Sequence, residues 1–397
     1  MINLINVKPL ILLASDNSNL TVGRKTLTGG ENGPVASKTV LGWCVHGPSS
    51  QNSVVEHVHF HYGQESADDE LTKMVQDSFS SEHFGVASIE KVPRSIEEER
   101  AEYILRSTTE RTGERFQTGL LWKCDNVSFP DSKGDALRRL KIMERKMDAD
   151  EKFADFYYGR IQEYVQKGYA RKLNRDEIMT KTPKARYIPH FSVYNDNKGK
   201  FRLVFDAAYK SGGVSLNDEL LKGPDLLNSV AAILLRFRRF KIGYTGDVKE
   251  MFHQVLIRPE DQHSQRFLWR GMERRRAPDE YVMQAMIFGA ACSPASAIYV
   301  MNRNAEDFRQ EFPDAVKAIQ ENTYMDDTMD SADSIEDAKK IIQDLIEVNR
   351  RGGFQICNFI CSSREVTKSI PPKLRTKNWK NLDSITALPA ERILGVW

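Results

Sequence analysis

The amino-acid sequence predicts an α+β fold in which short strands and amphipathic helices alternate. Two patterns support this. β-Branched and aromatic residues form short runs between turn residues, as in 242–247, whereas apolar residues recur every three or four positions in 148–167. The chain has 397 residues, 40% hydrophobic and 28% charged, which allows two or three domains with at least one sizeable core.

The composition argues against several classes of protein. No apolar run approaches the length of a membrane span, and residues 1–13 lack the charged start and the cleavage site of a secretion signal, so we expect a cytoplasmic protein without a membrane partner. Five cysteines without a C-x-x-C pair argue against a disulfide framework and a structural zinc site. A net charge of +2 is too small to make the whole protein a general polyanion binder, so any nucleic-acid contact would depend on basic residues clustered on one face.

The first half of the chain changes from strands to helices. Residues 1–50 read as a small β unit, with a buried run at 10–13 and a strand at 39–47. From about Asp68 the pattern becomes helical and charged. Ser95 with Glu98 three residues on predicts a capping box, and the helix over 148–167 should end at Gly168.

The second half predicts a strand-rich core with helices between the strands. Strands are expected at 187–193, 201–206, 242–247, 281–288 and 354–362, and helices at 225–240, from the Gly289 turn to about Phe308, and from Ser334 to Arg351. The turn between the first two strands is basic. Residues 318–323 and 328–331 lack a helical period, which predicts a hairpin with Asp326 and Asp327 at its tip.

The adjacent carboxylates of Asp326 and Asp327 suggest a metal site. Like charges disfavour joint ionisation unless a cation lies between them, and magnesium prefers carboxylate oxygens. Asp247, at the end of an earlier strand, could supply a further carboxylate for two ions that assist phosphoryl transfer. Taken alone, an Asp-Asp pair is more often a solvated turn.

The order of these motifs resembles a reverse transcriptase, and most closely the BEL/Pao class of LTR retrotransposons. The resemblance implies a polymerase right hand with fingers and an RRM-like palm, built from an antiparallel sheet and packed helices. Residues 10–47 are similar to the tail of the class's retropepsin-like protease. The motifs that carry the resemblance are Arg202–Asp206, Asp247–Gln254, Phe288-Gly289 with Ser293-Pro294, Tyr324–Asp327, Tyr187–His190, Ser215–Asn217, Gly223–Leu226 and Leu394–Trp397.

The resemblance implies roles for individual residues. Asp247, Asp326 and Asp327 would be the catalytic carboxylates and, with the Val248 carbonyl, would hold two Mg²⁺ ions, or Mn²⁺ in their place. One ion would activate the primer 3′-hydroxyl and the other would hold the triphosphate. Implied partners are an RNA or DNA template with its primer, dNTPs and the rest of a Pol polyprotein, and the setting would be cytoplasmic or a virus-like particle.

Further residues would contact the incoming nucleotide. Lys198, Lys200 and Arg202 occupy the place of phosphate-clamping fingers residues. Phe252 stands five residues after Asp247, where the family places an aromatic gate against a ribose 2′-hydroxyl, although a core phenylalanine is the alternative. The other residues assigned to this site are Phe288, Gly289, Tyr324 and Met325.

Three departures from the family pattern stand out. Phe288 replaces a glutamine that retroviral enzymes commonly carry, and Ala14 replaces a glycine of the protease tail. Asn358 stands where the class shows a lysine that is a candidate general acid for pyrophosphate. An amide is a poor proton donor, so slow turnover is expected.

The resemblance divides the chain into four parts: a protease remnant at 1–50, a linker at 51–69, a helical lead-in at 70–180, and fingers and palm at 181–397. The thumb, ribonuclease H and integrase regions are expected to be absent. The chain contains no Asp-Thr-Gly or Asp-Ser-Gly triplet, so we expect no proteolysis from it. The alternative function is an inactive or domesticated relic that binds nucleic acid through Arg236, Arg238, Arg239 and Lys241.

Overall fold

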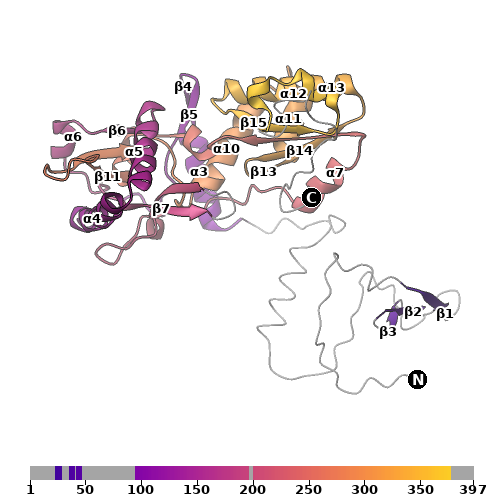
Figure 1. Cartoon of the computed structure of the whole chain (residues 1–397), viewed down its shortest axis with the longest axis horizontal. Helices are drawn as coiled ribbons and strands as arrows, with labels where there is room; N and C mark the ends of the chain where they lie inside the picture. Colours follow the sequence, from indigo (N-terminus) through magenta and orange to yellow (C-terminus); the bar gives the residue numbers. More distant parts are fainter. Residues whose placement is uncertain (1–22, 29–34, 41, 47–93, 196–199, 377–397) are drawn as a thin grey trace. The chain divides into compact units, whose positions relative to one another are not determined.

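The computed structural model describes residues 23–28, 35–40, 42–46, 94–195 and 200–376 (Figure 1). It separates into two units, Met1–His83 and Phe84–Trp397. In the first unit, β1 (Lys25–Thr28), β2 (Val35–Thr39) and β3 (Gly42–His46) form an antiparallel sheet in sequence order. This confirms a small β unit for the described part of 1–50. The run at 10–13 and the linker at 51–69 lie outside the described residues.

The second unit begins with helices whose ends the sequence specifies. Ser95 caps α3 (Ile96–Thr108) and forms the predicted capping box with Glu98. After α4 (Lys133–Ala149), Asp150 caps α5 (Glu151–Gln166), and the chain leaves α5 through Gly168 with a φ of +68°. A positive φ suits glycine because it has no Cβ. The predicted helix over 148–167 is therefore confirmed, with a break at Asp150.

The lead-in also contributes strands, which join it to later parts of the chain. β4 (Glu110–Thr112) pairs with β5 (Arg115–Thr118), and β5 pairs with β10 (Leu256–Ile257). β6 (Ala170–Lys172) pairs with β12 (Asp279–Met283), which pairs with β11 (Arg266–Trp269). A short helix, α6 (Arg175–Met179), follows β6. The elements before residue 180 and those after it consequently share one hydrophobic core.

The predicted basic hairpin is present as β7 (His190–Asn195) and β8 (Lys200–Phe205). Its inner face carries an aromatic cluster, in which the His190 ring lies among Tyr157, Phe205 and Phe267 at centroid distances of 5.6–5.8 Å. The turn at 196–199, which includes Lys198, lies outside the described residues.

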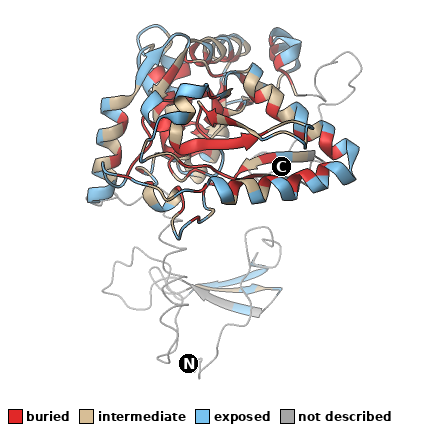
Figure 2. Ribbon diagram, turned by 90° about the vertical axis from the view of Figure 1, so that its left-hand side faces the viewer, coloured by how far each residue is buried: buried red, intermediate tan, exposed pale blue. Residues whose placement is uncertain are grey.

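The central sheet of the second unit has the strand order β13-β14-β9-β15 and is antiparallel throughout. Its strands are β9 (Ile242–Val248), β13 (Thr323–Tyr324), β14 (Asp327–Ala332) and β15 (Ile356–Cys361). The helices α11 (Pro313–Glu321) and α12 (Ile335–Arg351) pack against it, and α10 (Ser293–Glu306) packs against both helices. Figure 2 shows buried residues concentrated on the central strands of this unit, whereas the surrounding helices are buried on one face and exposed on the other.

The remaining helices are short: α7 (Val230–Phe237), α8 (Met251–Gln254), α9 (Pro259–Gln262) and α13 (Arg364–Ser369), with 3-10 turns at η3 (Asn217–Glu219), η4 (His263–Gln265) and η5 (Pro372–Leu374). Together, the sheets and helices confirm the predicted α+β fold. None of the helices in the described ranges has the length and apolar character that crossing a bilayer would require.

Three expectations about individual elements were wrong. Residues 318–321 belong to α11, because Pro313 starts a helix whose apolar face packs against the sheet, so only β13 precedes the acidic turn. The helix expected over 225–240 is limited to α7, since the Ser229 side chain accepts a bond from the Ala232 N–H and starts it there. The strand expected over 281–288 ends at Met283, where β12 loses its partner β6.

Candidate catalytic metal site

Asp247 and Asp327 are brought together by the pairing of two central strands. β9 and β14 run antiparallel, with Asp247 directly opposite Asp327 in the register. Asp327 also pairs with Tyr324 across the β13–β14 hairpin, so Met325 and Asp326 form its two-residue loop. The sequence therefore predicted correctly that the two adjacent acids lie at a hairpin tip.

The backbone of this loop is held in an unusual conformation. Met325 has a φ of +57°, a region that residues with a Cβ rarely adopt, and its half-buried side chain packs against the core. The N–H of Val248 donates to the carbonyl of Asp326 over 2.8 Å. This bond fastens the tip of the hairpin to the end of β9, and so keeps Asp326 beside Asp247.

The carboxylates of Asp247, Asp326 and Asp327 form one cluster. One oxygen from each lies within 4.8 Å of the others, and all three residues are half-buried. In the part of the chain that the structure describes, no other trio of acidic, histidine or cysteine side chains is grouped this closely. Three carboxylates at this spacing repel one another unless a cation lies among them, and oxygen ligands suit a hard divalent ion. The residues therefore fit the predicted ions.

Asp247 has a further neighbour that the sequence analysis did not identify. The side-chain amide of Asn358, on β15, donates from Nδ2 to Asp247 Oδ2 over 3.2 Å. The close approach of β15 depends on Gly246, because a Cβ there would lie 2.9 Å from Phe359 Cε1. Nothing in the spacing of residues 247 and 358 predicts this contact, since it depends on which strands pair.

Phe252 and Phe288 lie in ring contact beside the acidic cluster's strand. Their ring centroids are 4.6 Å apart and tilted by 54°. Phe252 is 8% exposed and belongs to the core, whereas Phe288 is 52% exposed. Phe288 therefore presents an apolar surface to solvent and packs on the buried ring of Phe252. This arrangement agrees with both the gate and the core interpretation of Phe252.

The side-chain amide of Asn217 holds the turn at Gly289 through two hydrogen bonds. Asn217 donates from Nδ2 to the Gly289 carbonyl over 2.8 Å and accepts at Oδ1 from the Ala291 N–H over 2.9 Å. Gly289 has a φ of +105°, and a Cβ there would lie 3.0 Å from the Phe205 carbonyl. A larger residue would therefore disturb the turn that carries Phe288.

Glu250 connects the segment after Asp247 to the lead-in. It has a φ of +51°, and its carboxylate accepts from Lys167 Nζ over 2.8 Å and from the Tyr169 hydroxyl over 3.0 Å. Burial alone would raise the pKa of the Glu250 carboxyl, but the hydrogen bonds and charge of Lys167, helped by Tyr169, leave it below its usual value. This ionised contact ties α5 to the turn that leads into Phe252.

The described basic residues that were assigned from the sequence lie on β8, on α7 and just after α7. Arg202 is exposed on β8, and Lys200 is at the start of that strand. Arg236 bonds to the side chain of Asn322 and the carbonyl of Glu321, and Lys241 lies 3.6 Å from Asp333. Arg238 caps α7, and the Arg239 guanidinium lies 4.8 Å from the Phe240 ring. Part of this basic surface is therefore already engaged within the protein.

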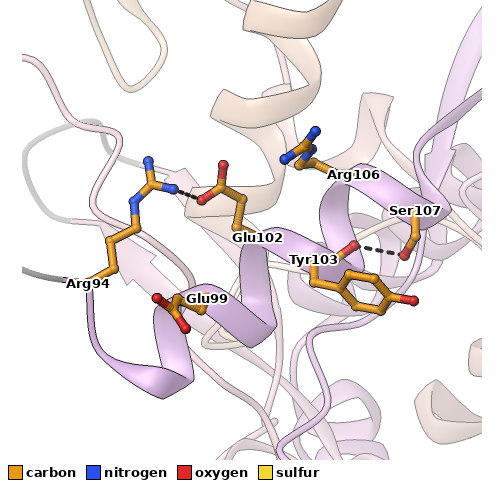
Figure 3. A pocket seen from close by; sticks show the side chains of 6 residues that line it. All are labelled: Arg94, Glu99, Glu102, Tyr103, Arg106 and Ser107. Carbon is orange, nitrogen blue, oxygen red and sulfur yellow. Dashed lines mark hydrogen bonds and ion pairs between the residues drawn. The ribbon is translucent and has the colours of Figure 1, made fainter.

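An open surface hollow lies on α3 and not at the acidic cluster. Figure 3 shows its lining, in which Arg94 pairs with Glu102, and the Ser107 hydroxyl donates to the Tyr103 carbonyl over 2.7 Å. Five of the six lining residues belong to α3, and the sixth, Arg94, lies two residues before it. None of the residues assigned from the sequence lines this hollow, so it is not the candidate site.

Comparisons with known proteins identify the segment that contains the cluster. Residues 215–358 match the family model described as reverse transcriptase (RNA-dependent DNA polymerase), and this range includes all three aspartates. A search among curated proteins found no match.

Among solved structures, the chain is similar to a foamy viral protease-reverse transcriptase in complex with double-stranded DNA, at 19% identity and a TM-score of 0.36. The match covers 49% of this chain and 28% of the viral one, so this chain corresponds to under a third of that relative's length. The family match locates the acidic cluster within a known kind of domain: residues 215–358 of this chain form a reverse transcriptase domain with a palm-like α+β fold.

Proposed function

We propose that this chain is an RNA-directed DNA polymerase that adds dNTPs to a primer 3′-hydroxyl by phosphoryl transfer assisted by two metal ions. The observation that carries the proposal is the cluster of Asp247, Asp326 and Asp327, with carboxylate oxygens within 4.8 Å, inside the segment that matches the reverse transcriptase family. The substrates would be dNTPs and an RNA or DNA template with its primer.

The three carboxylates would hold the ions, with the Val248 carbonyl as a further ligand. Mg²⁺ is the ion proposed, with Mn²⁺ as a substitute, because both accept oxygen ligands. When bound, such ions lower the pKa of an attacking hydroxyl and neutralise charge on the leaving group. The protein's part is to hold its three acids in a fixed arrangement, through the β9–β14 register and the bond from Val248 N–H to Asp326 O.

The incoming nucleotide would lie between the acidic cluster and the basic hairpin. Arg202, with Lys198 and Lys200, would contact the triphosphate, for which a guanidinium is well suited. Phe252 would act as the ribose gate, with Phe288, Gly289, Tyr324 and Met325 completing the site. The ring contact between Phe252 and Phe288 supports this, because it keeps an apolar surface at the end of β9 without a polar group that could bind a 2′-hydroxyl.

The finer identity that we propose is the Pol polyprotein of a BEL/Pao-type LTR retrotransposon. The flanking motifs Tyr187–His190, Gly223–Leu226 and Leu394–Trp397 support it. Under this proposal residues 1–50 are the end of a retropepsin-like protease, 70–180 a lead-in and 181–397 the fingers and palm.

A relic that only binds nucleic acid is the second candidate. Phe288 and Asn358 depart from the family pattern, which is expected of a decaying element. The intact trio of aspartates favours the enzyme, because a chain under no demand for metal binding has no reason to keep three repelling carboxylates together.

Primer extension on poly(rA)/oligo(dT) with Mg²⁺ or Mn²⁺ tests the proposal. The unaltered chain should extend the primer, and Asp326→Asn should lower the rate by at least about 100-fold, because it removes one charged metal ligand. Asp333→Asn is a matched control, since Asp333 is exposed and lies outside the cluster. Equal extension by the chain and by Asp326→Asn would refute the polymerase assignment.

A further inference from the structure

Asn358 lies in an irregular part of β15, beside the acidic cluster. Cys357 pairs with Asp247 in the register of β15 and β9, but the register shifts between Cys357 and Ile360. Asn358 falls in this β-bulge and has a φ of +52°. Bulges of this kind redirect a side chain away from the regular alternation of a strand.

The redirected side chain reaches a proposed metal ligand. Asn358 Nδ2 donates to Asp247 Oδ2 over 3.2 Å, while the residue itself remains exposed to solvent. An exposed side chain adds little to the core, so packing does not explain this asparagine. Glycine and asparagine are the residues that best tolerate a positive φ, and of the two only asparagine carries an amide donor.

We propose that Asn358 is a positioning residue, which orients the Asp247 carboxylate for a divalent ion; this inference rests on the proposed function. A donor on Oδ2 restricts rotation of the carboxylate and still leaves acceptor lone pairs for an ion. Hydrogen bonds of this type to a metal ligand raise the affinity of a site for its metal. Asn358, which replaces the family's lysine, thus has a role of its own, the orientation of Asp247.

The competing explanation is that the bulge alone requires Asn358, through its positive φ. Asn358→Gly separates the two, because glycine adopts that backbone conformation freely but has no amide to donate. Ser362→Ala is the matched control: it removes the Ser362 hydroxyl, which accepts from the Gly243 N–H over 3.0 Å, and so disturbs the same β15–β9 pair without touching Asp247.

Binding of Mn²⁺ to the full chain, followed by electron paramagnetic resonance without nucleic acid, is the direct measurement. We expect Asn358→Gly to weaken Mn²⁺ binding about 10-fold, the lower end of what loss of such a supporting bond costs. Ser362→Ala should bind as the unaltered chain does. In primer extension, the Mg²⁺ concentration for half-maximal rate should rise by a similar factor for Asn358→Gly, an effect that a purely structural role would not produce.

The outcomes are distinguishable. If the unaltered chain binds Mn²⁺, Asp326→Asn loses it and Asn358→Gly binds within twofold of the unaltered chain, the positioning role is refuted while the proposed metal site stands. If the unaltered chain binds no Mn²⁺, the proposed metal site itself fails. Should Asn358→Gly be destabilised, the Mn²⁺-induced shift of its unfolding midpoint, measured from a temperature at which the variant is folded, gives its affinity for comparison with the unaltered chain.

Discussion

Asp247 and Asp327 face each other as register partners on β9 and β14, with Asp326 completing the acidic cluster from the hairpin loop. Strand pairing, and not attraction between the side chains, sets this arrangement. The folded protein without metal therefore contains three like charges that the unfolded chain can separate, and this has a measurable consequence for stability.

Asp326→Asn should stabilise the metal-free protein. Removing one of three clustered charges should raise the free energy of unfolding by about 1 kcal/mol, a modest value because the residues are half-buried and water screens them. In Mn²⁺ the unaltered chain should be the more stable of the two, because the variant binds the ion less well. Thermal unfolding in EDTA and in Mn²⁺, with Asp333→Asn as control, measures both. A lower midpoint for Asp326→Asn in EDTA would contradict the repulsion argument.

Phe252→Ala should increase incorporation of ribonucleotides relative to deoxyribonucleotides. The large ring, packed 4.6 Å from that of Phe288, would no longer exclude a 2′-hydroxyl. The deoxy/ribo ratio of primer extension measures this, and Phe252→Tyr, which retains the ring, should keep the ratio. An unchanged ratio in Phe252→Ala would leave Phe252 a core residue only. The same substitution should cost about 3 kcal/mol of stability, since Phe252 is buried.

Lys167 and Glu250 should be energetically coupled across the junction of α5 and the turn after β9. Lys167→Met leaves the partly buried Glu250 carboxylate without its main partner and should cost about 1–2 kcal/mol. Glu250→Gln in the same chain should recover part of that cost. A double-mutant cycle by urea unfolding isolates this pair, which is necessary because Lys167 also contacts Glu163. Strictly additive costs would show that the contact does not stabilise the junction.

Stability should fall in acid partly because of His190. Burial lowers the pKa of this imidazole to about 4, against an ordinary value of 6.5, so the folded state favours the neutral ring. Its Nε2 lies 2.9 Å from the Leu268 carbonyl and must donate to it, so Nδ1 accepts from the Tyr157 hydroxyl and has no place for a second proton.

The sign of the effect follows from that lowered pKa. The contribution of His190 is complete above pH 6.5 and is lost as the pH falls from 6.5 towards 4, by up to about 3 kcal/mol. His190→Gln can make both hydrogen bonds without titrating, so it should flatten the pH dependence of urea unfolding in this range. Buried His253, whose pKa is also lowered to about 4, remains in both proteins, so the slope should diminish and not vanish. An unchanged slope would exclude His190 as a source of the pH dependence.

Local signals in the sequence predicted a large part of the fold. The Ser95 capping box, the end of α5 at Gly168 and the helix that Ser334 caps were all specified by residues a few positions apart. The sequence was misleading where tertiary packing determined the secondary structure. Residues 318–321 have no clear helical pattern of their own, yet they complete α11 because that helix packs against the central sheet.

The sequence by itself determined the chemistry of the candidate site: three aspartates, two of them in a tight hairpin loop and one at a strand end. Only the tertiary structure decided that Asp247 lies opposite Asp327, that Asn358 reaches Asp247 from a bulge, and that Phe252 supports Phe288. The physical reason is the range of the interactions. Caps and turns depend on neighbouring residues, whereas register, bulges and ring contacts depend on pairing between segments far apart in the chain.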